Sequence, residues 1–308
     1  MYAAAGFRIK WERSSLRPRH PYTKPMSSLN ADIRVLSDFL RSHHRIVALT
    51  GAGISAASGI PTYRDAGGTW RGQAPVQHQE FVSDPARRRR YWARSLLGWP
   101  AVRDARPNAA HLALARLEHH SVLDLIITQN VDRLHQRAGS QRVVDLHGRL
   151  DQVRCLSCDV VLGRETLQHD LLRANPGYRR SAPENLPDGD ADLPAIQEGD
   201  VEVPDCARCG GVLMPDVIFF GGSVPRSRVQ SCGQAIKDAD ALLAVGTSLQ
   251  VYSGFRFCRL AAELDKPIAL INPGKTRADP LASVKLTSDC GPLLGSVVDA
   301  LSPGRPEH

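Results

Sequence analysis

Four of the seven cysteines form two C-x-x-C pairs, a spacing at which thiolates commonly bind a metal ion. The pairs are Cys155 with Cys158 and Cys206 with Cys209. Together they supply a complete tetrahedral set of sulfur ligands for zinc, which leaves no open position for catalysis. The segment between them, residues 159–205, exceeds the usual gap of about 15–20 residues, so we expect it to be looped out. A redox role for one pair is the alternative, but the presence of two pairs favours structural zinc.

A glycine-rich turn follows the first apolar run of the chain. Residues 46–49 (IVAL) are long enough for a buried strand, and the chain continues as TGAGISAASG. Gly51, Gly53 and Ala56 fit the dinucleotide pattern G-x-G-x-x-A, in which glycines let the backbone approach a pyrophosphate. The acidic residue expected about 20 residues later is missing from residues 70–75 (WRGQAP). The turn therefore predicts dinucleotide binding of a variant kind, with an ordinary tight turn as the alternative.

Four further apolar runs end in small or polar residues, at 122–128, 143–146, 241–245 and 268–271. The carboxyl ends of parallel strands meet at one edge of an open α/β sheet, where ligands bind. The runs therefore predict an α/β fold with a doubly wound, Rossmann-like parallel sheet and a ligand along one edge. The residues that follow them are Gln129, Asn130, Val131 and Asp132; His147; Gly246, Thr247 and Ser248; and Asn272, Pro273 and Gly274.

His147 is the candidate catalytic histidine. It follows a predicted strand and precedes Gly148, so we expect it at the edge where the other polar residues gather. A neutral imidazole at that place suits a general base near pH 7. A structural histidine is the alternative from position alone.

Residues 151–213 interrupt the strand pattern with the cysteine pairs and a stretch rich in Pro and Asp. We expect a small zinc-ribbon module inserted into a Rossmann-like dinucleotide-binding domain. The expected division is a basic flexible tail at 1–30, the dinucleotide-binding domain at 31–150 and 214–300, the module at 151–213 and a C-terminal tail at 301–308. Helices are expected at 32–43, 87–106 and 111–120, and a flexible lid at 61–79.

Composition and charge narrow the class of protein. The 308 residues are 42% apolar and 23% charged, and no apolar run is long enough to span a membrane. The net charge of +7 is concentrated near the N-terminus and at residues 87–90, without a nucleic-acid-binding motif, so nucleic acid is not expected as the main partner. Few cysteines indicate a reducing compartment. We expect a bacterial cytoplasmic protein, or a mitochondrial matrix protein if residues 1–25 are a transit peptide.

The combined motifs resemble those of the sirtuins, the NAD-dependent protein deacylases, over residues 32–295. The YWAR, GWP and SLQVYSGFRF segments look most like the class II branch, which includes a mitochondrial animal sirtuin and bacterial relatives. The matching motifs are GAGISAASGIPTYR (51–64), TQNVDRLH (128–135), LHG (146–148), the cysteine pairs, MPDVIFFG (214–221), GTSLQVYS (246–253) and INPG (271–274).

The resemblance implies a role for each matching position. His147 would be the general base, and Asn130 would share the catalytic site. The segment from Val217 to Gly221 would be an edge strand that pairs with an extended substrate peptide. The residues expected to contact NAD are Gly51, Ala52, Gly53, Ile54, Ser55, Gly59, Pro61, Thr62, Tyr63, Arg64, Gln129, Asn130, Val131, Asp132, Gly246, Thr247, Ser248, Asn272, Pro273, Gly274 and Cys290. Those expected to contact substrate are Val217, Ile218, Phe219, Phe220, Gly221, Tyr91 and Arg94.

The reaction implied is lysine deacylation that consumes NAD. The acyl-lysine oxygen attacks the ribose carbon as nicotinamide leaves, and His147 takes a proton from a ribose hydroxyl that then attacks the resulting imidate. The products are free lysine, nicotinamide and O-acyl-ADP-ribose. For such a reaction the protein must mainly provide a desolvated pocket, a base and contacts that hold the leaving group in place.

Several features leave alternatives open. Gly222 stands where many relatives carry an acid, and Tyr63 where many carry Phe. Tyr91 and Arg94 resemble a pair that grips the carboxylate of acidic acyl groups, or else they form an ordinary surface pair of a helix. Protein mono-ADP-ribosyl transfer and removal of non-acetyl acyl groups are alternative activities. An NAD-dependent oxidoreductase and a zinc-ribbon nucleic-acid-binding module are alternatives of other classes.

Overall fold

The computed structural model describes residues 29–63, 75–178, 185–186, 190–191 and 201–301. The predicted basic tail (apart from residues 29–30), residues 64–74 of the predicted lid, Arg64 and residues 302–308 of the predicted C-terminal tail lie outside the described residues. Among the described helices, none has the length and apolar character needed to cross a membrane.

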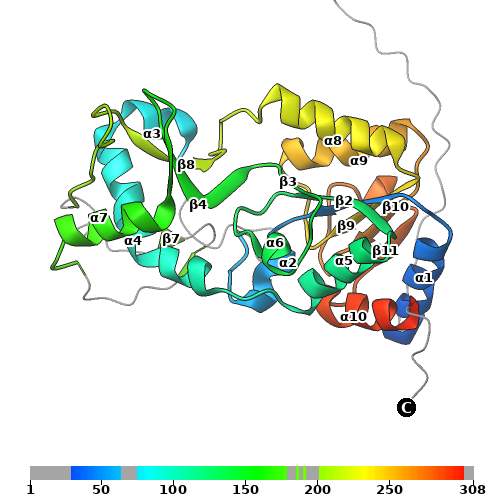
Figure 1. Cartoon of the computed structure of the whole chain (residues 1–308). Coiled ribbons are helices and arrows are strands. Elements are labelled where there is room, and N and C mark those ends of the chain that lie inside the picture. Colours follow the sequence, from blue (N-terminus) through cyan, green and yellow to red (C-terminus); the bar gives the residue numbers. More distant parts are fainter. Residues whose placement is uncertain (1–28, 64–74, 179–184, 187–189, 192–200, 302–308) are drawn as a thin grey trace, which may run out of the picture.

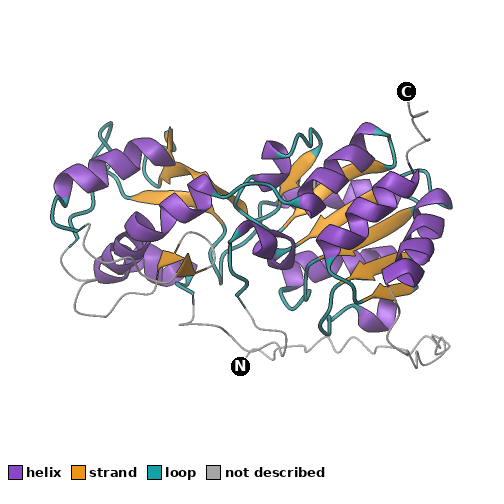
Figure 2. Ribbon diagram, turned by 90° about the horizontal axis from the view of Figure 1, so that it is seen from below, coloured by secondary structure: helices purple, strands orange, loops and turns teal. Residues whose placement is uncertain are grey.

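The larger lobe is built on a six-stranded parallel sheet with helices on both faces (Figures 1 and 2). The strand order is β11-β10-β9-β1-β2-β3, which is the doubly wound order, and the topological switch point lies between β1 and β9. The predicted sheet is thus confirmed, with β11 as an additional strand. The strands are β1 (Ile46–Thr50), β2 (Leu123–Thr128), β3 (Val143–Asp145), β9 (Ala241–Val245), β10 (Ile268–Ile271) and β11 (Val284–Leu286).

Alternate residues of each central strand pack on opposite faces of the sheet. Ile46 and Ala48 of β1 join the core beneath α1, α5 and α10, whereas Val47 and Leu49 join the core beneath α8 and α9. Strands buried on both faces appear in the sequence as continuous apolar runs. The helices of this lobe are α1 (Leu29–Arg41), α2 (Ala52–Ser55), η1 (Ala56–Ser58), α5 (Ala109–His119), α6 (Leu134–Arg137), α8 (Arg226–Asp238), α9 (Tyr252–Glu263), η4 (Asp279–Leu281) and α10 (Cys290–Leu301).

The smaller lobe contains a three-stranded antiparallel sheet in the order β5-β4-β8. Two helices from before the cysteine pairs, α3 and α4, pack in the core of this lobe through Phe81, Tyr91 and Trp92. The lobe is therefore formed by two separate stretches of chain, whereas the sequence predicted a single insertion at 151–213. Its elements are α3 (His78–Ser83), α4 (Pro85–Asp104), β4 (Gly148–Cys155), β5 (Val161–Gly163), α7 (Arg164–Ala174), β6 (Asn185–Leu186), β7 (Asp190–Ala191) and β8 (Leu213–Val217).

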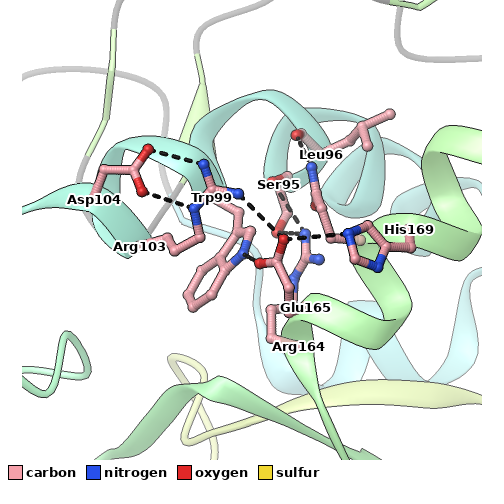
Figure 3. A network of polar contacts seen from close by, with 9 residues as sticks. Ser95, Leu96, Trp99, Arg103, Asp104, Arg164, Glu165 and His169 are labelled. Atoms are coloured by element: carbon pink, nitrogen blue, oxygen red, sulfur yellow. Dashed lines mark hydrogen bonds and ion pairs between the residues drawn. The ribbon is translucent and has the colours of Figure 1, made fainter.

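A polar network fastens α4 to α7 (Figure 3). Glu165 accepts hydrogen bonds from Trp99 at 3.0 Å and from Arg103 at 3.2 Å. The buried guanidinium of Arg164 lies against the rings of Trp92 and Trp99, 5.3 and 5.4 Å from their centroids. These contacts fix α4, and α4 in turn contributes a wall of the cavity described below.

Candidate functional site

A cavity of about 1690 Å³ lies where the carboxyl ends of the parallel strands face the smaller lobe. This exceeds the about 300–1,000 Å³ of a typical small-molecule pocket. The glycine turn after β1 and the loop after β9 form one wall, and Tyr91 of α4 with Val217 of β8 belong to the opposite wall. The cavity thus joins both lobes, and it opens at the sheet edge that the sequence indicated.

The glycine turn is shaped by its contact with the loop after β9. Gly53 N donates to the carbonyl of Gly246 at 2.8 Å, and a Cβ on Gly53 would lie 2.7 Å from that oxygen. Gly246 has φ +60, and a Cβ there would lie 2.4 Å from the backbone nitrogen of Ile54. The glycines are therefore required by backbone-to-backbone packing at the switch point, a reason that the sequence pattern alone did not supply.

Most of the predicted NAD contacts line this cavity. They come from the ends of β1, β2, β9 and β10 and from the start of α10. The predicted residues on the cavity wall are Gly51, Ala52, Gly53, Thr62, Tyr63, Gln129, Asn130, Val131, Gly246, Thr247, Ser248, Asn272, Pro273, Gly274 and Cys290. Ser55, Pro61 and Asp132 line a small adjoining pocket of about 40 Å³, together with Asn130.

Three predicted residues lie away from both cavities. Ile54 is fully buried in the core. Gly59, with φ +84, follows η1 in the left-handed region. Arg94 is 5% exposed and Tyr91 is 7% exposed, so neither belongs to a helix surface and the surface-pair interpretation is wrong. The two differ in that Tyr91 reaches the cavity wall and Arg94 does not.

His147 lies at the cavity wall with both ring nitrogens hydrogen-bonded. Nδ1 donates to the carbonyl of Gln129 at 3.0 Å, and Nε2 accepts from the Ser253 hydroxyl at 2.7 Å. Burial lowers the pKa of His147 to about 4, and the positive charge of Arg228 acts in the same direction. The ring is therefore neutral at pH 7, and its one lone pair, on Nε2, accepts the hydrogen bond from Ser253.

The backbone of His147 is held as firmly as its ring. Its carbonyl accepts from the backbone of Ile218 at 2.7 Å, which links it to the end of β8. The preceding carbonyl, of Leu146, accepts from Arg228 of α8 at 3.1 Å. Sequence reasoning named neither Ser253 nor Arg228 as site residues. Ser253 ends the GTSLQVYS motif, which was the signal available for it, whereas no pattern marked Arg228.

A buried polar network supports the glycine turn from behind. Ser55 donates to Asp132 at 2.7 Å and accepts from Asn130 Nδ2 at 2.9 Å. Asn130 Nδ2 also donates to the carbonyl of Gly51 at 3.1 Å. Burial raises the pKa of Asp132. The network fixes Asn130 beside the cavity.

Two buried histidines, His111 and His135, lie behind this network with ring centroids 4.9 Å apart. Burial lowers the pKa of His111 to about 4 and that of His135 to about 3. In the unfolded chain both titrate near pH 6.5, so below that pH the unfolded chain binds more protons than the folded protein. The free energy of unfolding should therefore fall by about 3–4 kcal/mol between pH 7 and pH 5 from these two residues.

Urea unfolding at pH 7 and pH 5 measures this effect. The variant with His111→Gln and His135→Gln removes both titrating groups, so its fall between the two pH values should be smaller than that of the wild type by the stated amount. An equal fall in the two proteins would show that the histidine pair does not carry the acid sensitivity.

The four cysteines of the two C-x-x-C pairs come together at the base of the smaller lobe. Their sulfur atoms all lie within 4.8 Å of one another, with Cys155 to Cys209 at 3.5 Å and Cys158 to Cys206 at 3.8 Å. A tetrahedral zinc with Zn–S bonds of about 2.3 Å places its sulfurs roughly 3.8 Å apart. The cluster therefore fits a four-thiolate zinc, as predicted, and a metal in it would have no position free for substrate.

The segment predicted to pair with a peptide lies at the end of β8, on the wall of the cavity. The segment from Val217 to Gly221 lines the cavity throughout, and β8 is an edge strand of its sheet. Only Val217 belongs to the strand itself, since the chain after it leaves the sheet and Phe220 forms an isolated bridge with Gln77. Phe219 packs against Phe81, with ring centroids 5.0 Å apart.

Comparison with known proteins identifies close relatives. A family model described as "Sir2 family" matches residues 51–253. An NAD-dependent protein deacetylase of Bordetella bronchiseptica is 50% identical over 273 residues, covering 89% of this chain and all of that protein. A solved Sir2 homologue in complex with NAD is 30% identical, with a TM-score of 0.68, and the match covers 92% of this chain and 97% of that one. A Sir2 mutant solved with a p53 peptide and NAD is 27% identical, with a TM-score of 0.69, covering 87% of this chain and 98% of that one.

Proposed function

This chain belongs to the Sir2 family and is an NAD-dependent protein deacetylase, and on that basis we propose how its residues carry the reaction. The observation that carries the proposal is the orientation of His147. Its Nδ1–H is committed to the Gln129 carbonyl, so Nε2 is the atom that takes a proton from a hydroxyl group bound in the cavity. The products are the free lysine, nicotinamide and O-acyl-ADP-ribose.

NAD supplies an activated glycosidic carbon with nicotinamide as its leaving group. The glycine turn and the ends of β9 and β10 would hold its two phosphates and adenosine, and Cys290 lies on the same wall. Asn130 and Asp132, fixed by Ser55, line the small adjoining pocket, where we place the nicotinamide. Those residues exclude water and orient the reacting groups.

The acylated peptide would lie along residues 217–221, with its backbone paired to this edge in the manner of an added strand. The acyl chain would enter the cavity beside Tyr91. A p53 peptide was bound in the solved structure of a Sir2 mutant, which supports a protein substrate here. We further propose membership of the class II branch, on the YWAR, GWP and SLQVYSGFRF segments, and a place in the bacterial cytoplasm, in line with the Bordetella relative.

The test is mass spectrometry of a panel of acyl-lysine peptides incubated with NAD. Release of nicotinamide together with an acyl-ADP-ribose would establish the reaction and identify the preferred acyl group. Label from NAD that stays on protein, with no peptide deacylated, would replace this proposal with ADP-ribosyl transfer. NADH formation would point instead to an oxidoreductase.

The acyl preference gives a separate prediction. Arg94 is buried and does not line the cavity, so we expect it to support α4 without reading a carboxylate on the acyl chain. Arg94→Met, which keeps most of the side-chain volume, should leave the ratio of glutaryl-peptide to acetyl-peptide turnover within about twofold of the wild type. A bidentate Arg–carboxylate contact is worth more than this, roughly 1.5–3 kcal/mol. A fall of tenfold or more in that ratio would therefore assign Arg94 to the acyl pocket.

A further inference from the structure

The charged side chains on the cavity wall are mostly basic. Among the described residues that line the cavity, the charged side chains are Arg226, Arg256, Lys275 and Asp289. Lys275 and Asp289 are neighbours in sequence of Gly274 and Cys290, which belong to the wall proposed for adenosine. The two arginines instead follow, in sequence, the peptide edge and the 250–253 segment. Among the described residues, this part of the wall therefore has cations without a carboxylate.

Arg226 is the first residue of α8 and lies just beyond the peptide edge, after Gly222. Its side chain is exposed and, in the described part of the chain, makes no hydrogen bond or ion pair. A cation in the first turn of a helix is disfavoured by the helix dipole, so this arginine does not stabilise its own helix. Arg228, two positions later, has a structural contact to the Leu146 carbonyl, whereas Arg226 has none.

Arg256 lies on α9, one turn after Tyr252, and its guanidinium is 5.1 Å from the centroid of the Tyr252 ring. Its Nε is buried and has no hydrogen-bond partner among the described residues. Arg259, the next arginine of the same helix, is paired with Glu263 at 3.2 Å. On α9, therefore, Arg259 lies outside the cavity and is paired with a carboxylate. Arg256 lines the cavity and has no carboxylate partner among the described residues.

We propose that the peptide side of the cavity selects acyl-lysine segments that carry Asp or Glu beside the modified lysine, with Arg226 and Arg256 contacting those carboxylates. The inference rests on the proposed function and specifies its substrate class. Arg226 is exposed and Arg256 is half-buried, and at about 0.2–1 kcal/mol for each contact the two together alter binding by roughly 2–30-fold. Salt should weaken the effect because the charges are screened.

Three acetyl-lysine peptides that differ only in their flanking residues, Glu, Ala or Lys, provide the test. With saturating NAD, kcat/KM should follow the order Glu, Ala, Lys at low ionic strength, and the spread should narrow at high ionic strength. The variant Arg226→Glu with Arg256→Glu should reverse the order through KM for the peptide. Arg259→Glu is the control on α9 outside the cavity, where it makes the charge reversal of one of the two substituted arginines. The variant Arg226→Gln with Arg256→Gln should give similar kcat/KM for the three peptides. It keeps the test decisive if the charge-reversed protein does not fold.

Binding of the same peptides, labelled and followed by fluorescence anisotropy, distinguishes a failure of the acidic-peptide selectivity from a failure of the proposed deacetylase mechanism. Equal kcat/KM for the three peptides, with the Ala peptide turned over, would overturn the selectivity and leave the deacetylase reaction intact. A change confined to KM for NAD would also overturn it, by assigning the arginines to the dinucleotide phosphates. If no peptide is turned over but binding still follows the charge order, the proposed mechanism fails and the acidic-peptide selectivity stands. If binding shows no charge order either, both fail.

Discussion

His147→Ala is expected to lower deacetylation of an acetyl-lysine peptide by about 10²–10⁴-fold, the usual contribution of a general base. The variant removes Nε2, the one ring nitrogen with a lone pair that can accept a proton, since Nδ1 donates to Gln129. The measurement is O-acetyl-ADP-ribose formed per enzyme at saturating NAD and peptide. Thermal shifts produced by NAD should persist, because His147 contributes a small part of the cavity wall.

Ser253→Ala is the matched comparison for that variant. It removes the hydroxyl that donates to Nε2 at 2.7 Å but keeps the imidazole. A net hydrogen bond of about 0.5–1.5 kcal/mol corresponds to a loss of roughly 2–10-fold. Wild-type turnover by His147→Ala would reject the residue as the base. Equal losses in the two variants would indicate that the contact with the Ser253 hydroxyl, and not proton transfer to the ring, accounts for the effect.

Removal of the metal is the second change with a large expected effect. Structural zinc supplies about 10–16 kcal/mol in small zinc-binding units, which is as large as the whole stability of a typical domain, about 5–15 kcal/mol. A strong chelator, or Cys206→Ser, should unfold the smaller lobe and abolish activity. The activity is lost because Tyr91 and Val217, two residues of the cavity wall, are held in that lobe.

Zinc content, thermal melting and deacetylation of one peptide measure the effect together. Cys232→Ala is the control, since Cys232 is a buried cysteine of α8 in the larger lobe and lies outside the cluster. That variant should lose some stability through its small cavity but keep about one zinc per chain. A chelated protein that melts and reacts like the wild type would show that the four-cysteine cluster needs no metal.

Most of the strands that the sequence revealed lie inside the sheet, and the half-buried edge strand β3 was predicted as well. Residues 46–49, 241–245 and 268–271 are continuous apolar runs, and 123–128 is mainly apolar, because these strands lie between helices on both sides of the sheet. The edge strand β11 was missed because it is three residues long and includes Lys285, so it has neither the length nor the apolar run of its neighbours.

Helix α4 was expected as a basic helix, and its residues 87–90 gave no sign of burial. Its later turns nevertheless insert Tyr91, Trp92 and Arg94 into the core of the smaller lobe. Helical periodicity shows poorly in α4, because arginines occupy its first turns and buried polar residues occur among the apolar ones. The pairing of α4 with α7, through Arg164 and Glu165, depends on contacts between distant parts of the chain.

The sequence by itself determined the parallel sheet, the four-cysteine set and the polar residues after each strand, because those features are local and repeat with a fixed period or spacing. The tertiary structure alone decided which atoms meet. It set Gly53 against Gly246, directed the Ser253 hydroxyl to His147, placed Arg94 away from the cavity and brought Arg226 and Arg256 to its wall. These contacts join residues far apart in the chain, and no local pattern encodes the distance between them.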